Sequence, residues 1–297
     1  MNLKSIKSFQ RFFKKPAEAK QPTNKRAKSS YRESSVSRVI RKFEPHKPAK
    51  SHKHHQTSFK VKLATSLAEK KSAHRLAYEV YFQKGYIEKN INQEHLLLED
   101  QNKDTAILMV EDLNGRLVGS VTIVTDQDKP LPSSHLFHEE IEHIKHKGSI
   151  AEYTRFVISE NARDSNHILS LLLNYAYMYS YHLMKKDYII CEVNPKHQRF
   201  YARFLAFNKL GDLKKCPLVK NAPAVFMYQE INEGRELLKK CQLDDKLKAK
   251  YFLFDQFLPI EDEKQAMIDL TKQNKKKFNP RKKDSLIYSD VGTLQAI

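Results

Sequence analysis

A regular pattern of hydrophobic and polar side chains begins abruptly at residue 59. Apolar residues alternate with lysines over 59–63, a period-2 pattern that predicts a half-buried strand. Ser66 and Glu69 follow with the spacing of a capping box, in which each side chain binds the other residue's backbone N–H. The apolar stripe that follows predicts a helix ending near Gly85, because glycine commonly terminates helices.

Strand and helix patterns continue in alternation to residue 231. Two β-rich runs, 105–110 and 117–124, flank Asn114-Gly115, a dipeptide typical of a tight hairpin. Beyond the hairpin, the pattern predicts a strand at 150–159, a long helix at 169–183, a strand at 188–193, a helix starting at Pro195 and a strand at 224–231. This order predicts an α/β fold with one mixed central sheet flanked by helices.

Composition divides the chain into three predicted segments. Residues 1–57 are rich in Lys, Ser, Pro and His and lack aliphatic periodicity, which predicts a basic, disordered tail. Residues 58–232 hold the strand and helix patterns and form the predicted core. Residues 233–297 are predicted to be a helical extension that becomes a lysine-rich tail after residue 272.

The net charge of +18 is concentrated in the N-terminal tail, which holds 16 of the 53 basic residues but only 3 of the 35 acidic ones. Such a tail favours an acidic partner, and the simpler alternative is a solvated leader without any partner. Apolar residues at helical spacing among the lysines of residues 1–15 are typical of a short amphipathic helix, for which an anionic membrane surface is one candidate partner.

The chain contains no apolar run near the roughly 20 residues that a transmembrane helix needs. Residues 1–15 also lack the pattern of a secretory signal. Three cysteines, at 191, 216 and 241, form no Cys-x-x-Cys pair, which argues against a disulfide framework or zinc ribbon. We therefore expect a cytoplasmic protein, with peripheral contact to the inner face of the membrane as a role for its tail.

Four segments carry a resemblance to a known family: RLAYEVY and KGYI within 75–87, LP, LF and EE within 131–140, AEYTRF at 151–156, and NPKH, FY and NAPA within 194–224. The third segment contains a Glu-x-x-Arg pattern. Together, within about 59–231, the segments resemble the N-acyl amino acid synthases of the FeeM type. That family is related to the acyl-homoserine lactone synthases in the acetyltransferase-like (GNAT) superfamily.

The resemblance implies a GNAT-like acyltransferase fold for residues 58–232. It implies transfer of a long-chain acyl group from the phosphopantetheine thioester of an acyl carrier protein to the α-amine of an amino acid. It implies no permanently bound cofactor. The superfamily's fold separates two parallel strands to admit the pantetheine arm, and here these would be the strands at 150–159 and 188–193.

Acyl transfer to an amine requires a neutral amine, a polarised carbonyl and a thiolate that can leave. Glu152 is the candidate base, with a structural ion pair to an arginine as the alternative. Arg155 is the candidate for binding the acceptor carboxylate or for holding Glu152. The two side chains point to opposite faces of a regular strand, and a β-bulge would bring them to the same face. Tyr201 is placed by the resemblance to protonate the thiolate, with core packing as the alternative.

Further candidate substrate contacts, with core packing as the alternative for Tyr81, are Arg75, Tyr81, Phe156, Asn194 and His197. Residues 163–168 lack the glycine-rich turn with which coenzyme-A-dependent relatives bind pyrophosphate, and this favours a carrier protein as donor. Basic side chains near that turn are candidates for contact with the acidic carrier protein: Arg163, Lys185, Lys186, Lys196, Arg199 and Arg203. Ala206-Phe207 departs from the Gly-Phe pair of many acetyltransferases.

Histidine pairs at 135/138 and 143/146 have spacings that a metal could use, but mixed Glu, His and Lys helices usually face solvent. We therefore expect no metal site. Cys191 has no His or Asp partner placed by the sequence, so a buried, inert thiol is favoured over a nucleophile.

Two other functions remain open at this stage. The same fold could use acyl-coenzyme A and act as an N-acetyltransferase on a protein or small amine. The basic tails could also bind nucleic acid, although the chain shows no nucleic-acid-binding motif and this function ranks last.

Overall fold

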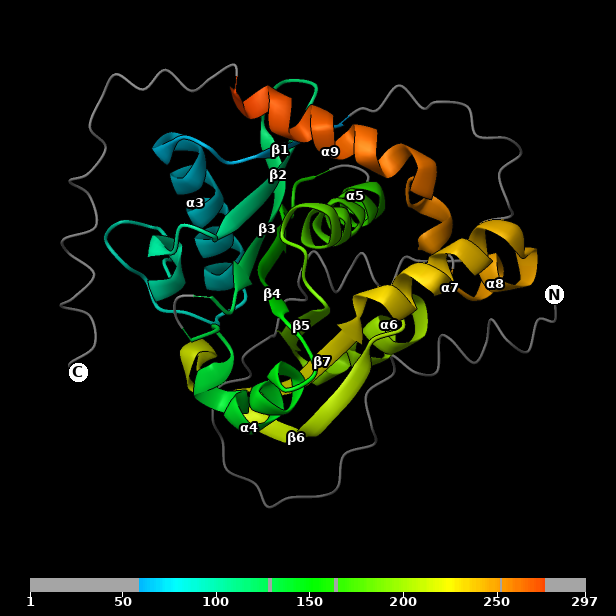
Figure 1. Ribbon diagram of the computed structural model, residues 1–297. Coiled ribbons are helices and arrows are strands. Elements are labelled where there is room, and N and C mark those ends of the chain that lie inside the picture. The colour runs from blue at the N-terminus through cyan, green and yellow to red at the C-terminus, as the bar shows by residue number, and fades with distance from the viewer. Residues whose placement is uncertain (1–58, 128–129, 163–164, 252, 276–297) are drawn as a thin grey trace, which may run out of the picture.

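The computed structural model describes residues 59–127, 130–162, 165–251 and 253–275 (Figure 1). Within this part of the chain, seven strands form one sheet in the order β1-β2-β3-β4-β5-β7-β6. The strands are β1 (Phe59–Leu63), β2 (Ala106–Asp112), β3 (Leu117–Thr125), β4 (Ile150–Ile158), β5 (Tyr188–Val193), β6 (Asn208–Cys216) and β7 (Ala222–Glu230). Only β4 and β5 pair in parallel, so the predicted mixed sheet is confirmed.

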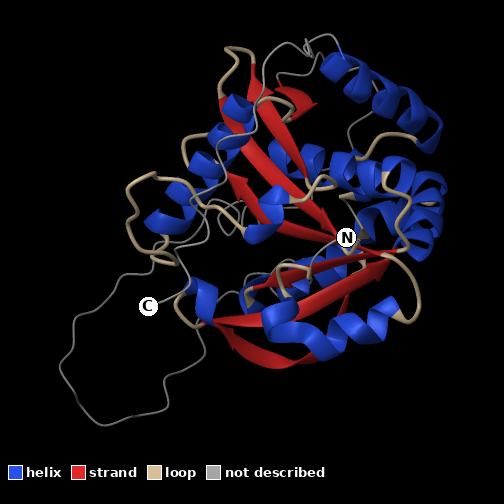
Figure 2. Cartoon of the chain, turned by 60° about the vertical axis from the view of Figure 1, so that its left-hand side comes forward, coloured by secondary structure: helices blue, strands red, loops and turns tan. Residues whose placement is uncertain are grey.

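Helices cover both faces of this sheet (Figures 1 and 2). The α-helices are α3 (Leu67–Gln83), α4 (Ser134–Lys145), α5 (Ser165–Met178), α6 (Pro195–Leu205), α7 (Ile231–Leu243), α8 (Asp245–Lys250) and α9 (Ile260–Lys275). Short turns of 3₁₀-helix occur at η1 (Leu98–Gln101), η3 (Pro217–Val219) and η4 (Phe254–Gln256), and the π-helical turn η2 (Tyr179–Leu183) continues α5. None of the helices in the described residues is both long and apolar enough to cross a bilayer.

Strand β2 shows how the alternating pattern builds two cores. Ile107 and Met109 point to one face and pack with Ala73 of α3. Leu108 and Val110 point to the other face and join the main core, which includes the apolar side of α5. Because successive side chains of a strand point to opposite faces, a continuous apolar run can serve both helices.

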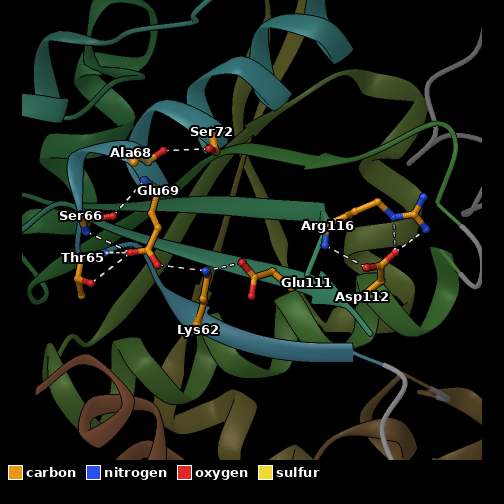
Figure 3. Close-up of polar contacts among 9 residues, drawn as sticks. All are labelled: Lys62, Thr65, Ser66, Ala68, Glu69, Ser72, Glu111, Asp112 and Arg116. Carbon is orange, nitrogen blue, oxygen red and sulfur yellow. Dashed lines mark hydrogen bonds and ion pairs between the residues drawn. The ribbon is translucent and has the colours of Figure 1, made fainter. Parts of the chain in front are cut away.

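The entry into α3 confirms the predicted capping box. The hydroxyl of Ser66 accepts a hydrogen bond from the backbone N–H of Glu69 at 3.2 Å, and Glu69 Oε2 accepts one from the backbone N–H of Ser66 at 3.1 Å. Figure 3 shows that Glu69 also accepts a bond from Lys62, whose ammonium lies between Glu69 and Glu111. The capping network therefore ties α3 to β1 and β2.

Strand β6 was not predicted, because its sequence carries no alternating pattern. It lies at the edge of the sheet and pairs only with β7. Most of its side chains are exposed, and Cys216 at its end is the buried one. An edge strand with little burial leaves little hydrophobic signal in the sequence.

The C-terminal helices share the main core with the sheet. Leu238 and Cys241 of α7 and Met267 and Leu270 of α9 are buried in the same cluster as the side chains of β3 and β4. Helix α9 contacts β1 (Figure 1). The boundary at residue 232 stays a prediction, and the predicted N-terminal tail with its amphipathic stretch at 1–15 lies outside the described residues.

The departure at Ala206 has a structural consequence. Ala206 ends α6 with φ at 55° in the left-handed region, where glycine lacks the steric cost of a Cβ atom. We expect Ala206→Gly to raise the free energy of unfolding by about 1 kcal/mol, measured by urea denaturation. Ala202→Gly, at an exposed interior position of the same helix, is the matched control and should lower it by about 1 kcal/mol. A destabilising Ala206→Gly would contradict this assignment.

Candidate active site

The parallel strands β4 and β5 separate soon after they meet. Only three residue pairs join them, from Ile150 with Tyr188 to Glu152 with Ile190. Beyond Glu152 the two strands diverge, and a cavity of about 220 Å³ opens there. Its walls come from β4, β5, α3 and α6, from the segment before α4 and from the residues between β6 and β7. The structure therefore contains the separation of strands that the resemblance implied.

Glu152 lies at the last paired position and lines the cavity, with 2% of its surface exposed. The backbone N–H of Ser133 lies 3.1 Å from both carboxylate oxygens, and the Ser133 hydroxyl donates to Oε2 at 3.0 Å. Glu152 has no ion pair with an arginine among the described residues. The structure therefore does not support the alternative of a structural ion pair.

Burial raises the pKa of Glu152 from 4.5 to about 8, because the charged form loses solvation. The hydrogen bonds from Ser133 act in the opposite direction and lower the pKa. The nearby negative charges of Glu192 and Glu99 raise it further. A carboxyl group with such a pKa can gain and lose a proton near neutral pH, as a general base must.

A β-bulge follows Glu152 and changes the direction of the next side chains. Ser120 of β3 pairs with Val157, whereas Thr122 pairs with Thr154, so one residue of β3 opposes two of β4. Arg155 lies within the bulge with φ at 46°. It contacts the segment that follows α3, and Arg155 and Glu152 line the same cavity. The conditional expectation of a bulge is confirmed.

Arg155 is buried and binds Asp100 of η1. Its Nη1 donates to Asp100 Oδ2 at 2.7 Å, its Nη2 forms a second short bond to Oδ1, and Nη1 also donates to the carbonyl of His95 at 2.9 Å. Burial favours a raised pKa for Asp100, but the hydrogen bonds from Arg155 and the proximity of His74, whose Nε2 lies 3.5 Å from Oδ1, hold this pKa well below its usual range. Arg155 therefore holds Asp100 rather than Glu152, and its contact with substrate stays a prediction.

Tyr201 of α6 lines the cavity, as the sequence suggested, and its ring packs edge-on against Phe200 and Phe207. Burial keeps the pKa of Tyr201 well above 10, so its hydroxyl keeps its proton. Tyr81 of α3 also lines the cavity and packs against His95 with ring centroids 4.8 Å apart. Both tyrosines combine packing with access to the cavity. Core packing and protonation of the thiolate are therefore compatible roles for Tyr201.

The other predicted substrate contacts divide into two groups. Phe156, Asn194 and His197 line the cavity, and Asn194 also caps α6 by accepting a bond from the Lys196 N–H at 3.2 Å. Arg75 does not line the cavity: its side chain is 59% exposed and lies 3.5 Å from Glu94. The structure therefore gives no support to Arg75 as a substrate contact.

The predicted carrier-protein contacts are also placed unevenly. Lys196, Arg199 and Arg203 are exposed on α6, whose apolar side packs into the core. Lys186 is buried and pairs with Asp126 at 2.9 Å, so it cannot meet a partner protein. Lys185 is exposed, and Arg163 lies outside the described residues.

Several residues of the site were not predicted from the sequence. Ser133 and Asp100 hold Glu152 and Arg155 from elements far away in the sequence, and only the fold brings them together. The structure also joins His135, Glu192 and Cys216 at the cavity wall. We call these three residues the His-Glu-Cys cluster. Cys191 lines the cavity as well, and its burial is confirmed.

The sequence model of the family described as N-acyl amino acid synthase FeeM matches residues 72–230, more than half of the chain. The chain belongs to this family. It is therefore an N-acyltransferase, and its fold is the acetyltransferase-like fold expected from the resemblance. The matched region contains β4, β5 and the cavity between them.

One solved structure agrees with the family at the level of the fold. FeeM, an N-acyl amino acid synthase from uncultured soil microbes, aligns with a TM-score of 0.53 and 22% identity, over 60% of this chain and 93% of FeeM. The acyl-homoserine lactone synthase LasI aligns with a TM-score of 0.47 and 17% identity, over 59% of this chain and 90% of LasI. A comparison with curated protein sequences gives no match.

The raised pKa of Glu152 makes the stability of the protein depend on pH. The folded state favours the protonated carboxyl, so its contribution is complete below about pH 4.5 and is lost as the pH rises toward about 8. The free energy of unfolding, relative to that of Glu152→Gln, should fall in this window by up to about 1.4 kcal/mol per pH unit. Urea denaturation of both proteins across this range measures the difference. A difference that does not change with pH would refute a raised pKa.

The pair of Arg155 with Asp100 should contribute strongly to stability. Asp100→Ala leaves a buried guanidinium without its carboxylate, and we expect a loss of about 3–5 kcal/mol in the free energy of unfolding. The exposed Asp104 provides the control, because Asp104→Ala removes a carboxylate without a buried partner. Equal effects of the two substitutions would show that the buried pair contributes no more to the free energy of unfolding than an exposed carboxylate does.

Proposed function

We propose that this N-acyltransferase is an N-acyl amino acid synthase, which moves an acyl group from an acyl carrier protein to the α-amine of an amino acid. The observation that carries the proposal is Glu152. It is a buried carboxylate with a pKa near 8, placed where β4 and β5 separate and where a thioester arm can enter. Few structural roles require an acid with these properties at this place.

The proposed reaction has three proton transfers. Ionised Glu152 removes a proton from the ammonium group of the acceptor, directly or through water, and the neutral amine attacks the thioester carbonyl. Collapse of the tetrahedral intermediate breaks the C–S bond and forms the amide. The departing thiolate takes a proton from the Tyr201 hydroxyl, and the tyrosinate regains one from the amine nitrogen or solvent. Because a thiol pKa is about 8.5, protonation of the thiolate by Tyr201 is less demanding than deprotonation of the ammonium group by Glu152.

The backbone at the separation can polarise the thioester carbonyl, the remaining requirement of the reaction. Beyond Glu152, the facing edges of β4 and β5 are not paired with each other. A backbone N–H on such an edge can donate to the thioester oxygen and stabilise the charge that develops in the transition state. Arg155 supports this geometry, since its bond to Asp100 holds the bulge beside the cavity.

Sequence and surface charge favour a carrier protein as the acyl donor. Residues 163–168 contain no glycine, so the close backbone approach that a nucleotide pyrophosphate needs is not offered. Lys196, Arg199 and Arg203 form an exposed basic face on α6, beside the cavity residues Asn194 and His197. An acidic carrier protein would dock on this face and insert its phosphopantetheine arm between the strands.

Glu152→Gln tests the proposal directly, because glutamine keeps the size of the side chain but cannot accept the proton. Pure protein is mixed with long-chain acyl carrier protein and a panel of amino acids, and thiol release and N-acyl product are measured. We expect the variant to lose about 10²- to 10⁴-fold in kcat. Glu139→Gln, an exposed acid on α4, should keep wild-type activity.

Two results would contradict the proposal. If none of the amino acids in the panel causes thiol release, amino acids are excluded as the acceptor class. A clear preference for acyl-coenzyme A over the carrier protein would instead assign the donor to the alternative, a coenzyme-A-dependent acetyltransferase.

A further inference from the structure

The His-Glu-Cys cluster brings three potential metal ligands together from three elements. His135 lies in the first turn of α4, Glu192 lies on β5 and Cys216 ends β6. Their ligand atoms all lie within 4.8 Å of one another, and the three side chains line the cavity that contains Glu152. We propose that this cluster binds a divalent transition-metal ion, with Zn²⁺ as the preferred ion.

The donor set and its spacing suit zinc. Imidazole nitrogen, carboxylate oxygen and thiolate sulfur are the three ligand types that zinc uses in proteins. With zinc bonds of about 2.0–2.3 Å in a tetrahedron, neighbouring ligand atoms lie about 3.5 Å apart. Nε2 of His135 and Sγ of Cys216 are 3.7 Å apart, so both atoms can reach one ion with little movement.

The imidazole of His135 is oriented as a metal ligand should be. Its Nδ1 lies 2.7 Å from the backbone carbonyl of Pro132. A carbonyl oxygen only accepts hydrogen bonds, so Nδ1 carries the hydrogen and Nε2 presents its lone pair toward Cys216. Metal-ligating histidines commonly fix their tautomer with this kind of outer bond.

The sulfur of Cys216 is a buried thiol, since burial and the neighbouring Glu192 raise its pKa to about 12, and a metal ion would bind here by displacing the thiol proton. The backbone N–H groups of Leu218 and Val219, in the turn that follows Cys216, both donate to Sγ. Hydrogen bonds of this kind become stronger when the acceptor carries charge. In a metal site they stabilise the ligating thiolate from its outer side.

The carboxylate of the cluster interacts with the Cys216 thiol and with His135. Glu192 is half-buried next to Cys216 and has no ion pair with a lysine or arginine within the described ranges. An ion bound between the carboxylate and the thiolate would compensate both charges. Three protein ligands leave a fourth position on zinc, which here can be taken by water or by a substrate oxygen in the cavity.

This assignment differs from the expectation drawn from the sequence. The sequence predicts that the histidine pair 135/138 faces solvent, and both side chains are exposed, but only His135 belongs to the cluster. The fold instead combines His135 with Glu192 and Cys216, which are 57 and 81 residues away in the sequence. The metal site does not depend on the acceptor or donor proposed above.

Cobalt titration of the full-length chain, freed of metal with a chelator, tests the proposal. A Co²⁺ ion bound to a cysteine gives a thiolate-to-metal charge-transfer band in the near ultraviolet, which histidine-only binding does not give. We expect this band to saturate at one equivalent of Co²⁺ per chain and to disappear when Zn²⁺ is added. Zn²⁺ should also raise the melting temperature.

Variants identify the ligands. Cys216→Ser should abolish the charge-transfer band, and His135→Ala and Glu192→Gln should weaken Zn²⁺ binding by at least the roughly 10- to 100-fold that loss of an outer-shell partner costs. His138→Ala is the matched control on the same helix and should bind as the wild type does. Circular dichroism and chelator-treated melting curves show whether each variant is folded.

Three outcomes overturn the proposal. One is a wild-type titration without the charge-transfer band, which would place any bound cobalt on histidines alone, such as those at 52, 54 and 55. Another is a band that survives Cys216→Ser, since it would then come from Cys191 or Cys241. The third is an equal loss of affinity in His138→Ala and His135→Ala. None of these readouts uses acyl transfer, so the metal site and the proposed activity can fail separately.

Discussion

The three-residue pairing of β4 with β5 is the constraint on which the rest of the site depends. A longer parallel ladder would join the strands through their full length and leave no space for a thioester arm. The pairing ends at Glu152, and the bulge that follows it contains Arg155, whose side chain lines the cavity. The opposite edge of β5 stays paired with β7 up to Val193, so the sheet continues across the opening. The cavity therefore replaces only part of one hydrogen-bond ladder, the one between β4 and β5.

Much of the fold could be predicted from the sequence, because the core elements carry strong local patterns. The capping box at Ser66, the hairpin at Asn114 and the helix start at Pro195 all appear where the local chemistry required them. Strand β6 could not be predicted, since its exposed edge gives no hydrophobic alternation. Its position nevertheless decides where Cys216 lies.

The site was predictable only in part, for a different physical reason. Glu152 and Arg155 lie on one strand, and their pattern could be recognised in a single short segment. Their partners Ser133 and Asp100 lie 19 and 55 residues away, on elements whose packing the sequence does not reveal. A local pattern can therefore name a candidate base, but its pKa is decided by contacts between distant segments.

The two buried carboxylates of the site show how those contacts divide the roles. Asp100 and Glu152 both lose solvation, which alone would raise the pKa of each. Asp100 receives the charged guanidinium of Arg155, so its pKa stays low and it remains a permanent anion that anchors the bulge. Glu152 receives only the neutral groups of Ser133, which do not outweigh burial, so its pKa rises to about 8. Environments that shift the pKa values of two acids in opposite directions distinguish the structural acid from the acid that exchanges protons.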